Sequence, residues 1–214
     1  MNQRHLTVIA LLILALFGWG LFSYQYVQFK NKDDYNGIIY YKEAPNFTLT
    51  DHNGQRVFLS QFRGKVTLLV WGYTYCPDIC PLTLSMLRDV MKELGDLADK
   101  VQVLYITVDP DRDTPERLKG YVPHFYERFI GLTGTPKEIE KVAKDYDVFF
   151  INHGDSYGRS ESDTWDTYLM THTTTIYLVD PRGKLLITYP YDKFDSKGMA
   201  KDIRKILKQK GEDN

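Results

Sequence analysis

The stretch Val66–Thr83, VTLLVWGYTYCPDICPLT, joins an apolar run to Cys76 and Cys80, the only two cysteines of the chain. The run Val66–Tyr73 predicts a strand covered on both faces. Pro81–Leu94 has the helical spacing of apolar residues, and its proline suits a first helical turn. The two cysteines therefore stand where a buried strand gives way to a helix, which is the sheet edge where α/β folds place their ligands.

Strand-like and helix-like segments alternate from Asn46 onward. An Asn-Gly step between two short apolar segments predicts a hairpin near the start, and Thr-Pro pairs mark helix starts further on. This order predicts an α/β fold with a mixed central sheet, flanked by helices and closed by an antiparallel hairpin. The predicted strands, besides Val66–Tyr73, are Phe47–Thr50, Val57–Leu59, Val101–Val108, Thr173–Val179 and Leu185–Tyr189, and the predicted helices begin at Pro81, Thr114, Thr135 and Ser196.

Composition and charge exclude some classes of function. Hydrophobic residues make up 43% of the 214 residues and charged residues 26%, as in an ordinary globular core with a polar surface. A net charge of −1 and a pI near 6.5 argue against nucleic acid as a partner. Two cysteines are too few for a disulfide scaffold, so a lone close pair points to redox activity or metal binding.

The N-terminal segment predicts a membrane anchor. Leu6–Phe22 carries no charged residue, and Ser23–Phe29 extends it with aromatic residues suited to a membrane interface. About 20 apolar residues span a bilayer as a helix. We therefore expect residues 1–29 to be an uncleaved transmembrane helix, 30–42 a linker, and 43–211 a soluble domain outside the cytoplasm. A cleaved signal peptide is the alternative, and it would leave the domain in the same compartment.

The spacing of the cysteine pair allows two kinds of chemistry. Residues four apart on a helix lie on one face, with about 6 Å of rise between them. Disulfides tolerate Cα separations of roughly 4.4–6.8 Å, so Cys76 and Cys80 can form a bond or converge on one ion. Two thiolates are soft ligands that suit Cu(I) or zinc. A zinc cage needs a fourth ligand, and none is evident near the pair, which favours copper.

Copper binding by this pair needs a third donor, and the five histidines are the first candidates. Of the five histidines, His172 opens a predicted apolar strand after the third helix. Such a strand would lie near the end of the run Val66–Tyr73, facing the cysteine loop. A lone histidine at a strand start is more often structural or solvated, so the residues alone leave two readings of His172 open, and this placement makes it a candidate third donor beside Cys76 and Cys80. Met170 would share a side of the strand with the histidine, and we expect it to pack in the core.

Three segments carry a resemblance to a known family. They are Tyr73–Pro81 (YTYCPDICP), Val108–Pro115 (VDPDRDTP) and His172–Gly183 (HTTTIYLVDPRG). Together they resemble the Sco/SenC family of membrane-anchored, thioredoxin-like copper proteins. The resemblance covers the predicted domain and the N-terminal anchor, and the combination of the three segments is specific where each alone would be weak.

The resemblance implies a fold and a role. It implies a thioredoxin-like domain in which Cys76, Cys80 and His172 bind copper, as Cu(I) or Cu(II). The role would be to deliver copper to the dinuclear copper site of cytochrome c oxidase, or to reduce the thiols of that site. The copper-containing oxidase subunit and the membrane are then the expected partners. Thr171 stands where the family often has an acidic residue, which would change how the imidazole is oriented.

A dedicated thiol–disulfide oxidoreductase is the main alternative. It would use Cys76 and Cys80 as a dithiol–disulfide couple acting on extracytoplasmic protein thiols. General reductases of the thioredoxin type have two residues between their cysteines and a proline facing them, whereas this chain has three residues and the run Thr171–Thr173. A structural disulfide closing so small a loop would constrain little of the unfolded chain. We therefore expect a metallochaperone rather than an enzyme, and assign no catalytic residue.

Overall fold

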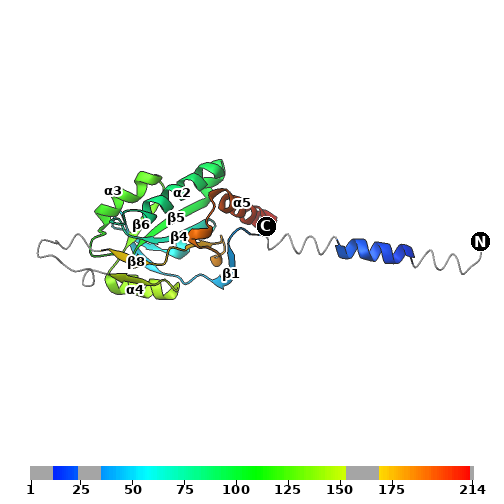
Figure 1. The fold of residues 1–214 in the computed structure, drawn as a ribbon, viewed down its shortest axis with the longest axis horizontal. Helices are drawn as coiled ribbons and strands as arrows, with labels where there is room; N and C mark the ends of the chain where they lie inside the picture. The colour runs from blue at the N-terminus through cyan, green and yellow to red at the C-terminus, as the bar shows by residue number, and fades with distance from the viewer. Residues whose placement is uncertain (1–11, 24–34, 153–168, 213–214) are drawn as a thin grey trace, which may run out of the picture. The chain divides into compact units, whose positions relative to one another are not determined.

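The computed structural model of the chain describes residues 12–23, 35–152 and 169–212 (Figure 1). The chain divides into two units, Met1–Tyr35 and Asn36–Asn214. In the first unit, residues 12–23 are helical. Within the described residues, no helix is both long and apolar enough to cross a membrane. The rest of the predicted anchor, residues 1–11 and 24–29, lies outside the described part of the chain.

Eight strands of the second unit form one mixed sheet in the order β1-β10-β9-β4-β5-β6-β2-β3. The central strands β4, β5 and β6 are parallel, and the other neighbouring pairs are antiparallel. A separate two-stranded antiparallel sheet pairs β7 with β8. The strands are β1 (Ile38–Glu43), β2 (Thr48–Asp51), β3 (Arg56–Phe58), β4 (Val66–Gly72), β5 (Val101–Thr107), β6 (Ile130–Thr133), β7 (Phe150–Asn152), β8 (Met170–His172), β9 (Ile176–Val179) and β10 (Lys184–Tyr189).

Helices cover both faces of the large sheet. In Figure 1, α2 and α3 lie on one side of the sheet and α4 lies on the other. The helix α2 also packs against α3 and α5. Thr114 and Thr135 cap α3 and α4 as predicted, since each hydroxyl accepts a hydrogen bond from a backbone amide of the first turn. The helices are α2 (Ile79–Leu94), α3 (Pro115–Phe125), α4 (Pro136–Asp145) and α5 (Ser196–Glu212), with short 3₁₀ turns at Leu59–Phe62, Gly95–Lys100 and Tyr191–Lys193.

One strand lies where the sequence predicts a linker. Ile38–Glu43 forms β1, which pairs antiparallel with β10, so the folded unit starts before the predicted boundary at residue 43. β1 is an edge strand whose residues are exposed or half-buried. Its apolar residues follow one another instead of alternating with polar ones, so the sequence carries no clear strand period there.

The strand that carries the histidine also differs from the prediction. His172 ends β8, which pairs with β7, and β9 begins only at Ile176. The expectation of a single strand running on from His172 to Val179 is therefore wrong. Three threonines, Thr173–Thr175, separate the two strands. Threonine is a good strand former, so the sequence gives no signal of this break.

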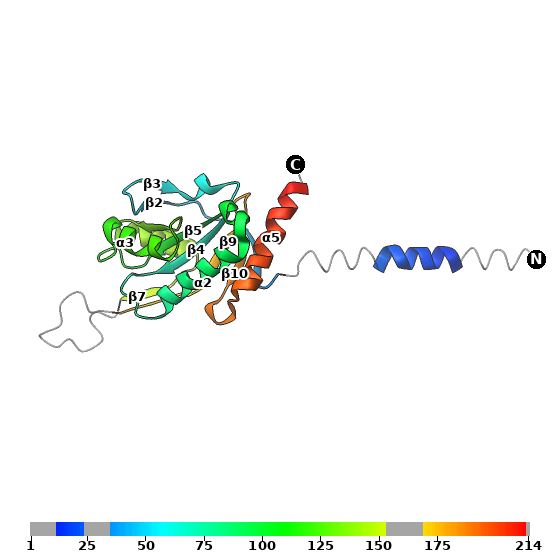
Figure 2. The same cartoon turned by 90° about the horizontal axis from the view of Figure 1, so that it is seen from above.

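The pairing of β9 with β4 brings the histidine strand to the cysteines. β9 runs antiparallel to β4, with Leu69 opposite Tyr177 and Thr67 opposite Val179. The start of β9 therefore lies at the carboxyl end of β4, as predicted. Every residue of β4 is buried, and Figure 2 shows β4, β5, β9 and β10 side by side with α2 and α5 lying over them. A rigid central strand thus fixes the start of the cysteine segment.

Candidate metal centre

The two cysteines follow the carboxyl end of β4. Cys76 lies in the loop between β4 and α2 and is half-buried, and Cys80 lies in the first turn of α2 and is 2% exposed. Both thiols are reduced. The helix begins at Ile79, ahead of the predicted start at Pro81. Cys80 is therefore fixed by the helix and the core, whereas Cys76 is held by its loop.

The structure brings His172 directly to Cys80. The Nε2 atom of His172 lies 3.5 Å from Sγ of Cys80, although 92 positions separate the two residues. Nδ1 of the imidazole lies 2.9 Å from the carbonyl oxygen of Thr173. A carbonyl oxygen can only accept, so the hydrogen must be on Nδ1, and Nε2 keeps its lone pair. The imidazole therefore presents a donor atom suited to a metal toward the sulfur.

Packing also fixes the imidazole. The ring of Tyr73 meets it edge to face, with 6.0 Å between the ring centroids. The Tyr73 hydroxyl accepts a hydrogen bond of 3.2 Å from the backbone amide of Met170, which ties β8 to the end of β4. Burial lowers the pKa of His172, and the hydrogen bond to Thr173 opposes this only in part. The imidazole is therefore neutral at pH 7, as a metal ligand must be.

The two thiols differ in acidity. The hydrogen bond from the Cys80 thiol lowers the pKa of Cys76 to about 5, helped by the backbone amides of Asp78 and Cys80 and opposed by burial. The same hydrogen bond, together with burial, raises the pKa of Cys80. At neutral pH the pair therefore carries one proton, with the thiolate on the more exposed Cys76. A thiolate is the reactive and metal-binding form of cysteine.

A glycine lets the cysteine helix approach the sheet. A Cβ atom added to Gly72, the last residue of β4, would lie 2.9 Å from Sγ of Cys80 and 2.5 Å from the hydroxyl oxygen of Tyr105. Contacts this short do not occur between packed atoms, so any side chain here would displace one of the two groups. Gly72 is therefore required by the close packing under Cys80, a requirement that the sequence alone does not reveal.

A buried carboxylate anchors the loop that carries Cys76. Asp113 is fully buried and accepts hydrogen bonds from the Thr74 amide (3.0 Å), the Thr74 hydroxyl (2.5 Å) and the Thr107 hydroxyl (2.6 Å). Burial raises the pKa of Asp113, and these hydrogen bonds oppose the rise. The motif at Val108–Pro115, whose local sequence points only to a family resemblance, thus has a physical role in holding the cysteine loop.

Two arginines flank the same loop. The guanidinium carbon of Arg117 lies 4.0 Å from the ring centroid of Tyr75, and that of Arg112 lies 4.5 Å from it. Arg117 also donates to the Thr74 hydroxyl (2.8 Å), and Arg112 forms a buried ion pair with Asp109 (2.5 Å). These contacts hold Tyr75, next to Cys76, between two cations.

The remaining candidate donors take other positions. Met170 is buried in the core, as expected, and His52 accepts a hydrogen bond from the Gly131 amide. His124 is exposed on α3, and His153 lies outside the described residues. In the part of the chain that the structure describes, no three His, Cys, Asp or Glu side chains form a metal-binding cluster as they stand. The structure therefore joins the candidate ligands in pairs, Cys76 with Cys80 and Cys80 with His172.

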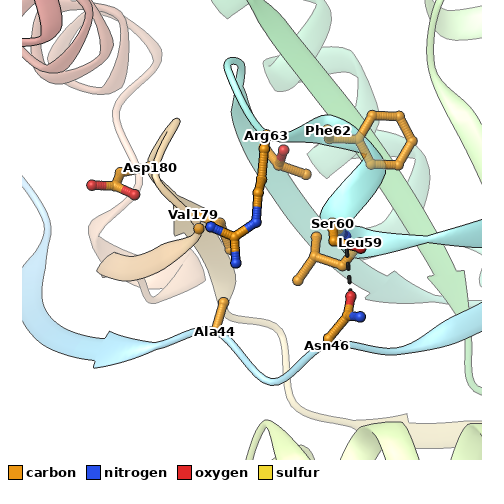
Figure 3. Close-up of a pocket in the computed structure, with 10 residues that line it drawn as sticks. Ala44, Asn46, Leu59, Ser60, Phe62, Arg63, Val179 and Asp180 are labelled. Carbon is orange, nitrogen blue, oxygen red and sulfur yellow. Dashed lines mark hydrogen bonds between the residues drawn. The ribbon is translucent and has the colours of Figure 1, made fainter.

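A separate pocket lies away from the cysteines and His172. Its lining includes Asn46, Ser60, Arg63 and Thr67, and Figure 3 shows Arg63 extending across it toward Val179. Thr67 is near the amino end of β4, whereas the cysteines follow the carboxyl end. The lining of this pocket contains neither a thiol nor an imidazole, so it lacks the soft ligands of the cysteine site.

Comparison with known proteins settles the family. The family model described as SCO1/SenC matches residues 40–208. The chain belongs to the SCO1/SenC family. An SCO2-like protein of Rickettsia conorii is 37% identical over 146 residues, which are 68% of this chain and 68% of that protein. The family resemblance predicted from the sequence is thereby confirmed.

Solved structures of SCO1/SenC proteins share the fold. The copper-bound ScoI of Bradyrhizobium japonicum is 37% identical to this chain with a TM-score of 0.67, covering 78% of this chain and 100% of that one. BsSco, described as a member of the Sco family of cytochrome c oxidase assembly proteins with a disulfide switch, is 25% identical with a TM-score of 0.60, covering 79% of this chain and 95% of that one. The predicted thioredoxin-like α/β fold with a mixed sheet is confirmed.

Proposed function

We propose that this SCO1/SenC protein binds one copper ion through Cys76, Cys80 and His172 and delivers it to the dinuclear copper site of cytochrome c oxidase. The single observation that carries the proposal is the approach of Nε2 of His172 to Sγ of Cys80, at 3.5 Å. Two donor atoms that share one ion, at bond lengths of roughly 2.0 and 2.3 Å, lie about 3.5 Å apart when the angle at the ion is tetrahedral. The observed separation thus suits a shared ion without further movement of either residue.

The chemistry of the three donors supports copper in particular. Two thiolates and one neutral imidazole form a soft set that suits copper, and they lack the fourth protein ligand of a structural zinc site. Copper binding by all three requires the sulfur of Cys76 to turn toward the Cys80–His172 pair. The loop position of Cys76 allows such a turn, since the helix and the core fix Cys80 but not Cys76. Among known relatives, the ScoI structure of B. japonicum holds copper.

Copper is the cargo of this protein, and the difference in burial between the two thiols indicates the side of the site from which copper leaves. Cys80 is buried and Cys76 is half-exposed, so an incoming ligand of a client protein can reach the ion from the side of Cys76. Because Cys76 is a thiolate at neutral pH, it binds the ion without first losing a proton. The copper-containing subunit of the oxidase is the proposed client, in line with the description of BsSco as an oxidase assembly protein.

We also propose that residues 1–29 anchor the chain in a membrane and that the folded domain lies outside the cytoplasm. The uncharged stretch Leu6–Phe22 and the aromatic residues after it support this proposal. Residues 30–35 would then link the anchor to the domain, because β1 moves the start of the folded unit to Asn36.

Copper titration of the reduced full-length protein tests the proposed site. Wild type should bind one copper ion with sulfur-to-copper charge-transfer absorption. His172→Ala should lose more than about a hundredfold in copper affinity, since even outer-shell changes cost metal sites roughly 10- to 100-fold. His124→Ala, a change at an exposed histidine on α3, is the matched control and should bind like wild type. Equal affinity of wild type and His172→Ala would refute the three-ligand site.

A cellular experiment tests the client. Cells that lack the protein should lose oxidase activity, and added copper should restore part of it. Normal oxidase activity together with impaired reduction of extracytoplasmic disulfides would contradict the copper-delivery role and favour the second candidate function.

That second candidate is a thiol–disulfide oxidoreductase that uses the same cysteines. The observation that favours it is the difference in acidity within the pair. A thiolate at Cys76 can attack a disulfide of a client protein and release one client thiolate. Cys80 can then resolve the mixed disulfide as its proton passes to the second departing client thiolate, which leaves a Cys76–Cys80 disulfide and a reduced client. The disulfide switch described for BsSco shows redox chemistry in a relative. His172→Ala separates the two functions, since it removes a copper ligand and leaves both thiols in place.

A further inference from the structure

A buried hydroxyl beneath Cys80 lacks a hydrogen-bond partner. Tyr105 lies in β5 opposite Val70 of β4 and is 0% exposed. Among the described residues, its hydroxyl oxygen completes no hydrogen bond of normal geometry. Buried polar atoms nearly always have a partner, because an unmade hydrogen bond costs free energy away from water. The hydroxyl of Tyr105 therefore needs an acceptor stronger than a neutral thiol.

The nearest candidate partner is the sulfur of Cys80. The hydroxyl oxygen and Sγ of Cys80 lie 2.5 and 2.9 Å from the same point, the position of a Cβ atom added to Gly72, so they border one small space. The ring of Tyr121 packs against that of Tyr105, with 6.1 Å between the centroids, and keeps it in place. No side chain comes between the hydroxyl and the sulfur from β4, because Gly72 has none.

We propose that Tyr105 is a positioning residue whose hydroxyl donates a hydrogen bond to Sγ of Cys80 whenever that sulfur is a thiolate, as it is when it ligates copper. This inference rests on the copper-binding function proposed above. A thiol sulfur is a weak acceptor, so a neutral Cys80 satisfies this hydroxyl poorly, although the hydroxyl is close enough to favour the thiolate form of Cys80. A thiolate is a charged acceptor, and hydrogen bonds to charged groups are about twice as strong.

Burial leaves this sulfur with few other donors. Cys80 is 2% exposed, so water does not reach its thiolate in the way that it reaches the half-buried Cys76. His172 faces it through Nε2, which carries no hydrogen when Nδ1 donates to Thr173. The backbone amide of Tyr73 and the hydroxyl of Tyr105 are then the donors that can compensate the buried charge, and Tyr105 supplies the side-chain one. Hydrogen bonds around a cysteine sulfur tune the reduction potential of a copper site.

Tyr105→Phe removes the hydroxyl and keeps the ring. The variant should still bind one copper ion, because all three ligands remain. Its preference for Cu(I) over Cu(II) should fall roughly three- to tenfold, since the lost donor stabilises the more negative Cu(I) site more strongly. A tenfold change corresponds to about 59 mV for a one-electron couple, so the copper potential should fall by about 30 to 60 mV. The sulfur-to-copper charge-transfer band should move to lower energy. An unchanged potential and band would overturn the inference.

A matched variant separates this effect from loss of stability. Tyr189 is also buried, lies in β10, and donates its hydroxyl hydrogen to Asp202 of α5 (2.8 Å). Tyr189→Phe should lower the denaturation midpoint and leave the copper potential and the charge-transfer band unchanged. A shift of the same size in both variants would show a general effect of weakened packing, and it would contradict a specific role for Tyr105.

A second readout needs no copper. Cd²⁺ is a soft, redox-inactive ion, and its binding deprotonates the cysteines, so it puts Cys80 in the thiolate form that accepts from Tyr105. Tyr105→Phe should bind Cd²⁺ roughly three- to tenfold more weakly than wild type, measured by sulfur-to-cadmium absorption, and Tyr189→Phe should bind it like wild type. If wild type bound no copper, the proposed function would fail, and the Cd²⁺ affinity alone would decide the role of Tyr105. An unchanged Cd²⁺ affinity would then refute it.

Discussion

Replacing Asp113 by Asn should loosen the loop that carries Cys76. The carboxylate of Asp113 accepts three hydrogen bonds, two from Thr74 and one from Thr107. Both hydroxyl hydrogens are committed to it, because the Thr74 hydroxyl accepts from Arg117 and the Thr107 hydroxyl accepts from the amide of Asp109. An Asn amide presents a donor at one of the two positions, so at least one threonine hydroxyl would lose its acceptor.

The size of the effect follows from these contacts. Hydrogen bonds to a charged group contribute about 1.5–3 kcal/mol each, and an unsatisfied buried donor costs about 1–3 kcal/mol. Asp113→Asn keeps the shape and one acceptor oxygen, so we expect a loss of about 2–3 kcal/mol in the free energy of unfolding. Because Thr74 stands two residues before Cys76, copper affinity should fall as well.

Urea denaturation of the full-length protein, followed by tryptophan fluorescence, measures the loss of stability. Asp111→Asn is the control, because it makes the same chemical change at an exposed position two residues away in the same loop. It should change stability by less than about 0.5 kcal/mol. If Asp113→Asn unfolded at the same urea concentration as this control, the reasoning about the carboxylate anchor would be refuted.

Two further predictions concern the cysteine pair. Cys80→Ala removes the thiol that donates to Cys76, so the pKa of Cys76 should rise from about 5. The pH dependence of the Cys76 alkylation rate should shift to higher pH by the same amount. An unchanged pH dependence would show that the backbone amides alone stabilise the thiolate. Gly72→Ala forces a methyl group between Cys80 and Tyr105. It should lower the free energy of unfolding by about 1–3 kcal/mol, measured by urea denaturation, and weaken copper binding. Wild-type stability and copper affinity in this variant would contradict the close packing described.

A prediction about pH follows from the buried histidine. Burial lowers the folded-state pKa of His172 below its usual value of 6.5. The imidazole therefore stays neutral down to lower pH than in the unfolded chain, and copper should remain bound at pH 7 and be released as the pH falls below 6.5. His172→Ala should lose that part of the pH dependence of copper binding. Copper binding that does not change with pH below 6.5 would contradict ligation by the imidazole.

Much of the fold was predictable because the sequence carries local signals with a physical cause. The apolar run of β4, the Asn-Gly hairpin and the Thr-Pro helix starts each fix one element by themselves. The edge strand β1 was not predictable, since its exposed residues carry no period. The strand β6 (Ile130–Thr133) was also missed, because four residues are too short to give a clear pattern.

The candidate ligands were predictable, but their surroundings were not. A lone pair of cysteines stands out in any sequence, and the order of strands brings His172 to it. The break between β8 and β9 was hidden by a run of threonines that would suit a continuous strand. The roles of Gly72, Tyr105 and Asp113 depend on contacts across β4 and β5, and such contacts have no local signature in the sequence.

X-ray absorption at the copper edge of the loaded full-length protein would test most directly whether two sulfurs and one imidazole surround a single ion. We expect two sulfur neighbours and one histidine nitrogen in wild type, with the nitrogen signal lost in His172→Ala and one sulfur lost in Cys76→Ser. A shell of nitrogen and oxygen alone, or a histidine signal that persists in His172→Ala, would contradict the site assigned to this protein.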